Sequence, residues 1–122
     1  VKTTEQFEAL YEKVKADWVK LWFEDYNTLP LEQNPANYSN LLNAIERAYK
    51  WGVNNQIPIL LGEFGTYYEA PYSSRVIWTK YVRQESEKRG IAWCYWDFGL
   101  WFSVYNLSAE QWNEEILKAL ID

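Results

Sequence analysis

Two acidic side chains follow apolar segments that have the composition of buried strands. Glu63 lies between two glycines in the segment Leu-Gly-Glu-Phe-Gly at 61–65, and Asp97 follows the segment Trp-Cys-Tyr-Trp at 93–96. In α/β folds, ligands gather at the carboxyl ends of the strands, so both carboxylates are expected near a cleft. By position alone, Glu63 is equally consistent with catalysis and with a structural role, whereas a structural salt bridge is favoured for Asp97.

The chain has 122 residues and no histidine. Ser-His and Cys-His nucleophilic machinery and the usual zinc sites are therefore excluded. Acid and base catalysis would have to rest on carboxylates, tyrosine or lysine. We expect no metal ion and no cofactor. The single cysteine, Cys94, excludes an internal disulfide, and its apolar neighbours predict a buried, inert thiol.

Aromatic residues are numerous, with 8 Trp and 10 Tyr. Such rings commonly fill cores, because they bury a large area at a small cost in rotamer entropy. They also offer flat faces on which sugar rings stack. The functional interpretation of this aromatic content is therefore a carbohydrate cleft, set against plain core filling.

The net charge is −5, from 17 acidic and 12 basic residues without a long basic run. Nucleic acid and an anionic membrane surface are therefore not expected as partners, whereas a neutral or small ligand is. No apolar run approaches the ~20 residues that span a bilayer, and no signal peptide is visible at Val1. With 48% hydrophobic residues, the chain is expected to form a single domain over 1–122.

The first part of the chain predicts two helices around a short extended segment. Residues 3–26 contain no Gly or Pro and carry apolar side chains at helical spacing, and Thr3 and Gln6 have the spacing of a capping box. The segment 29–33 is expected to be a short strand before a turn at Asn-Pro. A second helix is expected over 37–51, with a glycine near its end.

Two apolar segments further along predict strands of a parallel sheet. Residues 57–61 form a continuous apolar run, which is typical of a strand covered on both faces, and residues 91–96 form a second one. Helices are expected between and after them, so the pattern predicts right-handed βαβ units. The expected fold class is α/β.

Caps are expected for the last two helices. Ser73 or Ser74 should begin a helix that ends near residue 88, with Ile77 turned inward. Ser108 and Gln111 have the spacing of a second capping box before the apolar residues of the last helix.

Five segments together carry a family resemblance. They are Ile-Pro-Ile-Leu-Leu-Gly-Glu-Phe-Gly at 57–65, Ser-Arg at 74–75, Trp-Thr at 78–79, and the segments 90–99 and 102–106. Over roughly residues 41–122 the chain resembles the last two βα units of the cellulases of glycoside hydrolase family 5. The resemblance implies part of a TIM barrel and cleavage of β-1,4-glucan or cello-oligosaccharides.

The resemblance also implies roles for individual residues. The family uses the Glu of Gly-Glu-Phe-Gly as nucleophile, and the Trp of the Tyr-Trp pair after its last strand stacks on the sugar. Glu63 and Trp96 match these two positions. Tyr67, in the loop that follows Glu63, is also expected to bind the substrate.

The N-terminal part is similar to the helix that precedes the family's fourth strand, which would then lie at 29–35. The family ends that strand with Asn-Glu-Pro, whose Glu is the general acid/base, whereas this chain has Glu-Gln-Asn-Pro at 32–35. Asn34 then matches the Asn that hydrogen-bonds near the sugar. The catalytic Glu is missing from the motif, and Glu32 is the nearest candidate for its role.

A rival alignment places the family's sixth strand at 21–27, with Glu24 where the family has His and Tyr26 where it has Tyr. We prefer the first alignment, because the helical periodicity continues through Trp22. In the first alignment the fifth and sixth strands are absent. In either alignment the acid/base is not where the family has it.

The missing residue matters because a retaining mechanism needs two carboxylates about 5 to 5.5 Å apart. General acid/base help contributes about 10²- to 10⁴-fold in rate, so turnover by this chain alone is expected to be impaired. A full barrel takes about 200 or more residues, and the sequence predicts only about three strands. Exposed strand edges favour pairing with a second chain, so a homo-oligomer is one arrangement that would complete the barrel.

Two hypotheses follow. The first is a secreted hydrolase of cellulase type, with Glu63 as nucleophile and Glu32, or less favourably Glu24 or Asp97, as acid/base. The second is a noncatalytic glucan-binding or structural fragment of a (β/α) barrel, which keeps the family's core without its chemistry.

Overall fold

The computed structural model describes residue 9 and residues 11–122. The chain divides into two compact units, Val1–Leu41 and Leu42–Asp122. The proposed caps at Thr3 and Gln6 lie outside the described residues. No helix among the residues described is long and apolar enough to cross a bilayer.

In the first unit, helix α2 spans Asp17–Thr28, and residues 14–16 before it have no regular structure. The predicted continuous helix over 3–26 is therefore wrong at this break. Trp18 and Leu21 of its apolar face are exposed within the structure. Helical periodicity without a surface to pack on stabilises a helix only weakly, which explains why the pattern did not produce one unbroken helix.

The predicted strand over 29–33 is wrong. Leu31–Gln33 form a short 3₁₀ helix, η1. The Nδ2 of Asn34 donates to the carbonyl oxygen of Tyr26 at 2.8 Å, and the side chain of Asn37 donates to the carbonyl of Leu31. Such local bonds from asparagine side chains compete with an extended backbone, so the segment curls into a turn.

Helix α3 spans Tyr38–Asn55 and confirms the second predicted helix, with one more turn than expected. Gly52 is not its terminating residue. A Cβ atom on Gly52 would lie 2.6 Å from Cγ1 of Ile59, so this glycine permits a close approach of the chain that follows. The left-handed conformation that ends the helix belongs to Gln56, with φ of 55°.

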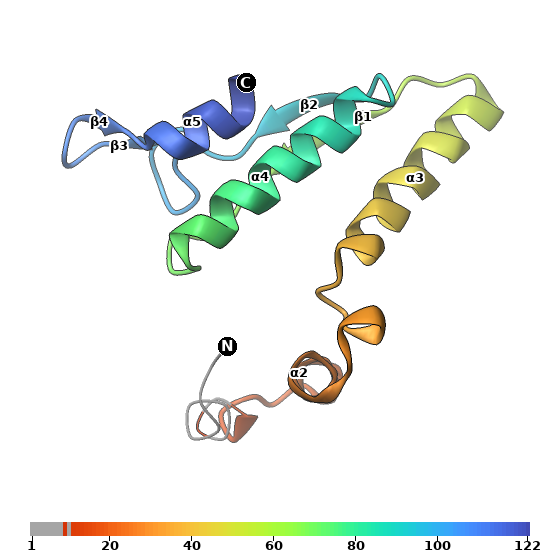
Figure 1. The fold of residues 1–122 in the computed structure, drawn as a ribbon, viewed down its shortest axis with the longest axis vertical. Helices are drawn as coiled ribbons and strands as arrows, with labels where there is room; N and C mark the ends of the chain where they lie inside the picture. The colour runs from red at the N-terminus through yellow and green to blue at the C-terminus, as the bar shows by residue number, and fades with distance from the viewer. Residues whose placement is uncertain (1–8, 10) are drawn as a thin grey trace. The chain divides into compact units, whose positions relative to one another are not determined.

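The second unit contains the predicted parallel pair. Strand β1 (Leu60–Phe64) pairs with β2 (Ala92–Tyr95), and helix α4 (Tyr72–Glu87) connects them. Figure 1 shows α4 lying beside the two strands, with α5 (Glu114–Ile121) packed against α4. A short antiparallel hairpin of β3 (Tyr105–Asn106) and β4 (Gln111–Trp112) precedes α5.

Only one face of the β1–β2 pair is covered within the described chain. The ring of Phe64 contacts those of Trp78, Trp93 and Tyr95, with centroids 5.4 to 6.2 Å apart. On the other face Leu60 is 62% exposed, and Cys94 is exposed too. The expectations of strands covered on both faces and of a buried Cys94 are therefore wrong, because these side chains remain exposed among the residues that the structure describes.

The buried side of α4 is largely polar. Its buried residues are Arg75, Thr79, Val82, Arg83, Glu85 and Ser86. Ile77, which was expected to point inward, is instead 70% exposed. The inward face carries these polar residues together with Val82, so an orientation based on hydrophobicity alone is wrong for Ile77.

Neither predicted serine cap is present. Helix α4 begins after Pro71, and α5 begins after Asn113, without a side-chain cap in either case. The backbone N–H of Ser108 instead donates to Oδ1 of Asn106 at 3.0 Å, within the β3–β4 turn. The predicted capping box was therefore a hairpin turn, in which asparagine takes the local bonding role.

Candidate active site

Glu63 lies at the carboxyl end of β1, as its position between two glycines predicts. Strand β1 begins three residues later than the predicted strand, so Glu63 falls within it. Its side chain is exposed in the described structure. A carboxylate at this end of a parallel sheet is where ligands of (β/α) folds are bound.

The pairing of β1 with β2 is irregular at Glu63. Leu61 is opposite Trp93 and Phe64 is opposite Tyr95, so Gly62 and Glu63 face the single residue between Trp93 and Tyr95. This is the arrangement of a β-bulge, which re-aims the side chains of the bulged strand and is common beside active sites. Gly62 is the one sequence feature that could have signalled the bulge.

The segment that follows Glu63 is held against the end of β2. The backbone N–H of Trp96 donates to the carbonyl oxygen of Phe64 at 2.8 Å. A Cβ atom on Gly65 would lie 1.8 Å from the carbonyl oxygen of Trp96. The two motifs singled out in the sequence are therefore adjacent, and the Trp96 side chain beside them is 49% exposed.

Asp97 stabilises the loop after β2. Its carboxylate accepts backbone N–H bonds from Leu100 at 2.6 Å and Phe102 at 3.3 Å, and its carbonyl oxygen accepts one from Val104 at 3.1 Å. The peptide bond between Trp96 and Asp97 is cis. Asp97 therefore has a structural role, through backbone amides rather than through the salt bridge that was expected.

Tyr67 lies in an aromatic group formed by two loops. Its ring centroid is 4.7 Å from that of Tyr68 and 5.8 Å from that of Phe102. The backbone N–H of Tyr68 donates to the carbonyl oxygen of Trp101 at 2.8 Å, which ties the loop after β1 to the loop after β2. Hydrogen bonding to Tyr67 and then to Glu69 raises the pKa of the Tyr68 hydroxyl to about 12.

Glu32 and Asn34 belong to the first unit, whereas Glu63, Tyr67 and Trp96 belong to the second. Glu32 is exposed on η1. Both ends of the Asn34 side chain serve local bonds: Nδ2 donates to Tyr26, and Oδ1 accepts the N–H of Ala36 at 3.0 Å.

Glu24, the other carboxylate considered for the acid/base role, lies on helix α2. It accepts a hydrogen bond of 2.6 Å from the Tyr11 hydroxyl, and this bond is the main cause of the raised pKa of Tyr11. The rival alignment, which treats 21–27 as a strand, is therefore wrong, because these residues are helical.

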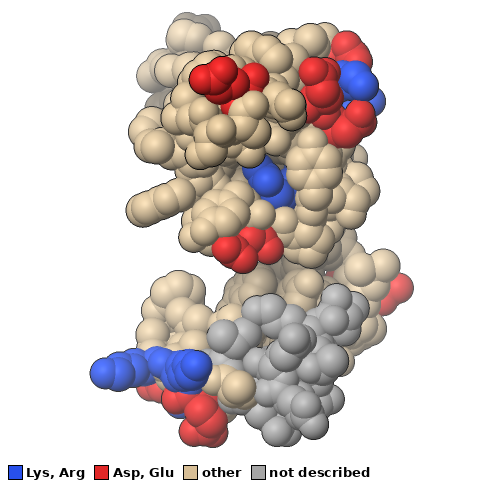
Figure 2. Space-filling model, turned by 90° about the vertical axis from the view of Figure 1, so that its left-hand side faces the viewer, with Lys and Arg blue, Asp and Glu red and all other residues tan. Residues whose placement is uncertain are grey.

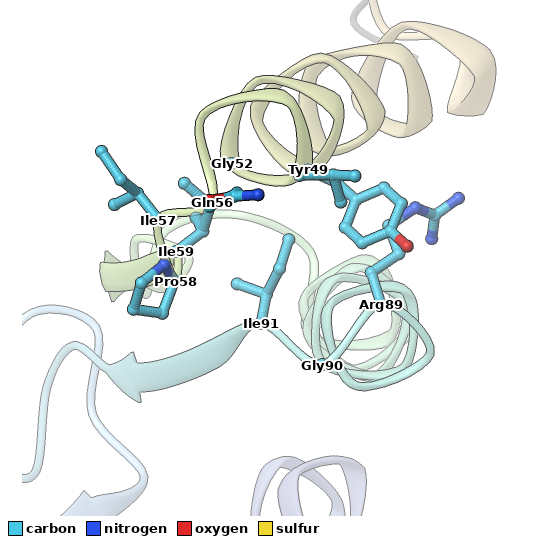
Figure 3. A pocket seen from close by; sticks show the side chains of 10 residues that line it. Tyr49, Gly52, Gln56, Ile57, Pro58, Ile59, Arg89, Gly90 and Ile91 are labelled. Atoms are coloured by element: carbon cyan, nitrogen blue, oxygen red, sulfur yellow. The ribbon is translucent and has the colours of Figure 1, made fainter.

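A cavity of about 200 Å³ lies at the opposite end of the strands from Glu63. Figure 3 shows Ile59 and Ile91 facing it from the chain before the two strands, with Tyr49 and Arg89 at one side. Arg89 is paired with Glu46 at 2.7 Å and with Glu85 at 2.8 Å, so it offers no free charge to a ligand. The cavity therefore contributes nothing to the site at Glu63.

The surface shown in Figure 2 is mostly uncharged, with charged side chains in small groups, some of which contain both acidic and basic residues. Among the described residues no cluster of His, Cys, Asp and Glu has a geometry that could hold a metal ion. The group around Glu63 is thus composed of a carboxylate, aromatic rings and backbone amides.

Known proteins of one family are similar to this chain. Residues 10–100 match the model of cellulases of glycosyl hydrolase family 5. Endoglucanase H of Acetivibrio thermocellus is 33% identical in an alignment of 78 residues, which covers 59% of this chain and 9% of that protein.

Solved structures are similar as well. Cel5A of Thermotoga maritima, determined in complex with mannotriose, superposes with a TM-score of 0.68 and 38% identity over 71% of this chain and 28% of its own. Cellulose synthase subunit Z of Clostridioides difficile superposes with a TM-score of 0.67 and 38% identity. That match covers 78% of this chain and 30% of the solved chain. The chain thus spans less than a third of these solved chains. It belongs to glycosyl hydrolase family 5, and its parallel strands and helices are part of that family's TIM barrel.

Proposed function

We propose that residues 42–122 carry the nucleophile side of a retaining β-glucan hydrolase site, with Glu63 as nucleophile and Trp96 as the ring that stacks on the sugar. The observation that carries this proposal is the position of Glu63 in the bulge of β1, one residue before the Phe64–Trp96 backbone bond. The carboxylate of Glu63 and the exposed indole of Trp96 therefore lie at the carboxyl ends of two neighbouring strands.

The proposed chemistry has two displacements. A carboxylate oxygen of Glu63 bonds to the anomeric carbon while the bond to the leaving oxygen breaks, and an acid supplies a proton to that oxygen. Water then attacks the anomeric carbon of the glycosyl ester and loses its proton to the residue that first served as acid, while the bond to Glu63 breaks. Tyr67 and Asn34 are proposed as further substrate contacts, and a β-1,4-linked glucan is the proposed substrate.

The proton donor is the missing part. Glu32 is the proposed acid/base, since it is the carboxylate nearest to the family's position in the sequence. Without an effective donor, turnover should fall by about 10²- to 10⁴-fold for substrates with poor leaving groups. We therefore propose that hydrolysis of glucan by this chain alone is impaired.

The cleft also needs more strands than the described chain supplies. Strands β1 and β2 pair only with each other in the part of the chain that the structure describes. We propose that further strands, in a longer form of the polypeptide or in a second copy of this chain, complete the barrel around Glu63. We also propose that residues 1–122 belong to a single domain. Secretion of the protein is proposed from its resemblance to cellulases.

A second candidate function is a noncatalytic glucan-binding or structural role. It is favoured by Asn34, whose side chain is engaged by local backbone bonds, and by the placement of Glu32 on a 3₁₀ helix. In this case Trp96 and Tyr67 would bind glucan while Glu63 would be an inherited carboxylate.

Hydrolysis of a dinitrophenyl β-cellobioside separates the two functions, because this leaving group hardly needs an acid. The proposal predicts release of dinitrophenol above the uncatalysed rate, abolished in Glu63→Gln. Glu110→Gln, which changes an exposed carboxylate of the β3–β4 turn, is the matched control and should leave the rate unchanged. Equal rates for the wild type and Glu63→Gln would support the noncatalytic function.

A further inference from the structure

Arg75 is a buried cation without a carboxylate partner in the described structure. It lies in the first turn of α4 and is 6% exposed. Its Nε lies 3.4 Å from Oγ1 of Thr66, its guanidinium lies 5.9 Å from the ring centroid of Tyr72, and its Nη2 has no hydrogen-bond partner among the residues described. Burying a charge is costly unless it is paired, so the position of Arg75 calls for a physical reason.

Arg83 offers a direct comparison on the same helix. It lies two turns later and is 7% exposed. Unlike Arg75, it has an ion pair, with Glu87 at 2.7 Å, and its Nε donates to the carbonyl oxygen of Ala119 at 3.1 Å. Arg83 therefore links α4 to α5, whereas Arg75 lies near the opposite end of α4.

The neighbours of Arg75 connect it to both motifs of the candidate site. Thr66 comes three residues after Glu63 and directly after Gly65, which abuts Trp96. Tyr95 pairs with Phe64, and its hydroxyl donates to the carbonyl oxygen of Phe102 at 2.7 Å. Burial raises the pKa of Tyr95, and the charge of Arg75 opposes this effect.

We infer that Arg75 is a positioning residue: from beneath the carboxyl ends of β1 and β2, its guanidinium holds the segment 62–66 through Thr66, and so fixes the orientation of Glu63. The inference rests on the proposed function of Glu63 for its catalytic consequence. The mechanical part, which is the restraint of the segment 62–66, stands on the geometry alone.

Two variants remove the restraint to different degrees. Arg75→Met keeps the length and apolar stem of the side chain but removes every donor. Thr66→Val removes only the hydroxyl acceptor and keeps the shape, so it should fold even if Arg75→Met does not. Arg75→Lys is the conservative variant, since it restores one charged donor. Arg83→Met is the matched control for the loss of an equally buried arginine from the same helix.

Hydrogen exchange of backbone amides, followed by mass spectrometry of peptides covering 62–68, tests the restraint. We expect exchange to rise about tenfold or more in Arg75→Met, by a smaller factor in Thr66→Val, and to fall back toward wild type in Arg75→Lys. In Arg83→Met the increase should be confined to the end of α4 and to α5. Wild-type exchange over 62–68 in both Arg75→Met and Thr66→Val would overturn the inference, as would an equal rise in Arg83→Met.

The rate at which a 2-deoxy-2-fluoro cellobioside with a good leaving group labels Glu63 tests the catalytic consequence. In Arg75→Met the inactivation rate constant should fall about ten- to a hundredfold, while the concentration for half-maximal inactivation stays near the wild-type value. If the wild type is not labelled while exchange responds as expected, the proposed function of Glu63 fails and the restraint by Arg75 holds. If labelling is unaffected in Arg75→Met, the positioning role is contradicted.

Discussion

The carbonyl oxygen of Trp96 occupies the space that a side chain on Gly65 would need: a Cβ atom built there would lie 1.8 Å from it. Gly65 closes the motif that contains Glu63, and Trp96 opens the loop after β2, so two segments 31 residues apart in the sequence are in direct backbone contact. The neighbouring bond from Trp96 N–H to the Phe64 carbonyl adds to this contact. The spacing between the proposed nucleophile and the proposed sugar platform is therefore set by backbone, not by flexible side chains.

Gly65→Ala should destabilise the second unit by about 1–3 kcal/mol or more, because the new methyl group meets backbone that cannot move aside without breaking the contact between the strands. Gly62→Ala is the matched control: nothing lies within 4 Å of its Cβ position, so its effect should stay within about 0.5 kcal/mol. Urea unfolding of the two variants measures both. Equal stabilities would mean that Gly65 and Trp96 are not in close contact.

Ile116→Val should lower the free energy of unfolding by about 0.5–1.5 kcal/mol, because Ile116 is fully buried, at 0% exposure, where α5 packs on α4. The same change at Ile77, which is exposed on α4, should cost less than about 0.5 kcal/mol. Thermal melts of the pair give the comparison. A larger loss for Ile77→Val than for Ile116→Val would show that α4 presents its other face to the core.

The stability of the second unit should fall in acid through Glu85. Hydrogen bonds from Lys88 and then Arg89 hold the pKa of Glu85 below its ordinary value of 4.5. A carboxyl group whose pKa is lower in the folded state stabilises that state above its unfolded pKa, and the contribution is lost as the pH falls through the folded pKa. The free energy of unfolding should therefore decline below about pH 4.5.

Glu85→Gln tests the assignment of that decline. The variant should be less stable than the wild type near about pH 7 and should lose less stability on acidification, so the two profiles converge in acid. Urea unfolding at a series of pH values measures the profiles. Parallel curves for the wild type and Glu85→Gln would contradict the role of Glu85.

The elements that pack on one another could largely be predicted from the sequence. Helix α3, helix α4 and the parallel pair β1–β2 follow the predicted pattern, because each places side chains against a neighbour. The region before Asn34 departs from prediction, since helix α2 contains no buried residue and local hydrogen bonds decide its conformation. Hydrophobic periodicity therefore predicts a helix or strand correctly where its apolar face packs against a neighbouring element.

The candidate site could be predicted only in part. Glu63 was predicted at a strand end because its flanking glycines and apolar strand are local features of the sequence. The bulge and the burial of Arg75 and Thr79 could not be predicted, since both depend on which residues of β2 and of the loop lie opposite. Polar residues on the inner face of α4 leave no hydrophobic signature, and this is why Ile77 was assigned to the wrong side.

The role of Glu63 as nucleophile is tested by the mass of the intact, folded protein after incubation with a 2-deoxy-2-fluoro glucoside that carries a good leaving group, followed by peptide mapping. The fluorine slows hydrolysis of a glycosyl ester, so a reactive nucleophile accumulates as a stable adduct. We expect one adduct, located on Glu63, absent from Glu63→Gln and retained in Glu110→Gln. A folded protein that gains no mass, or that is labelled elsewhere, would contradict the assignment of Glu63 as nucleophile in this chain.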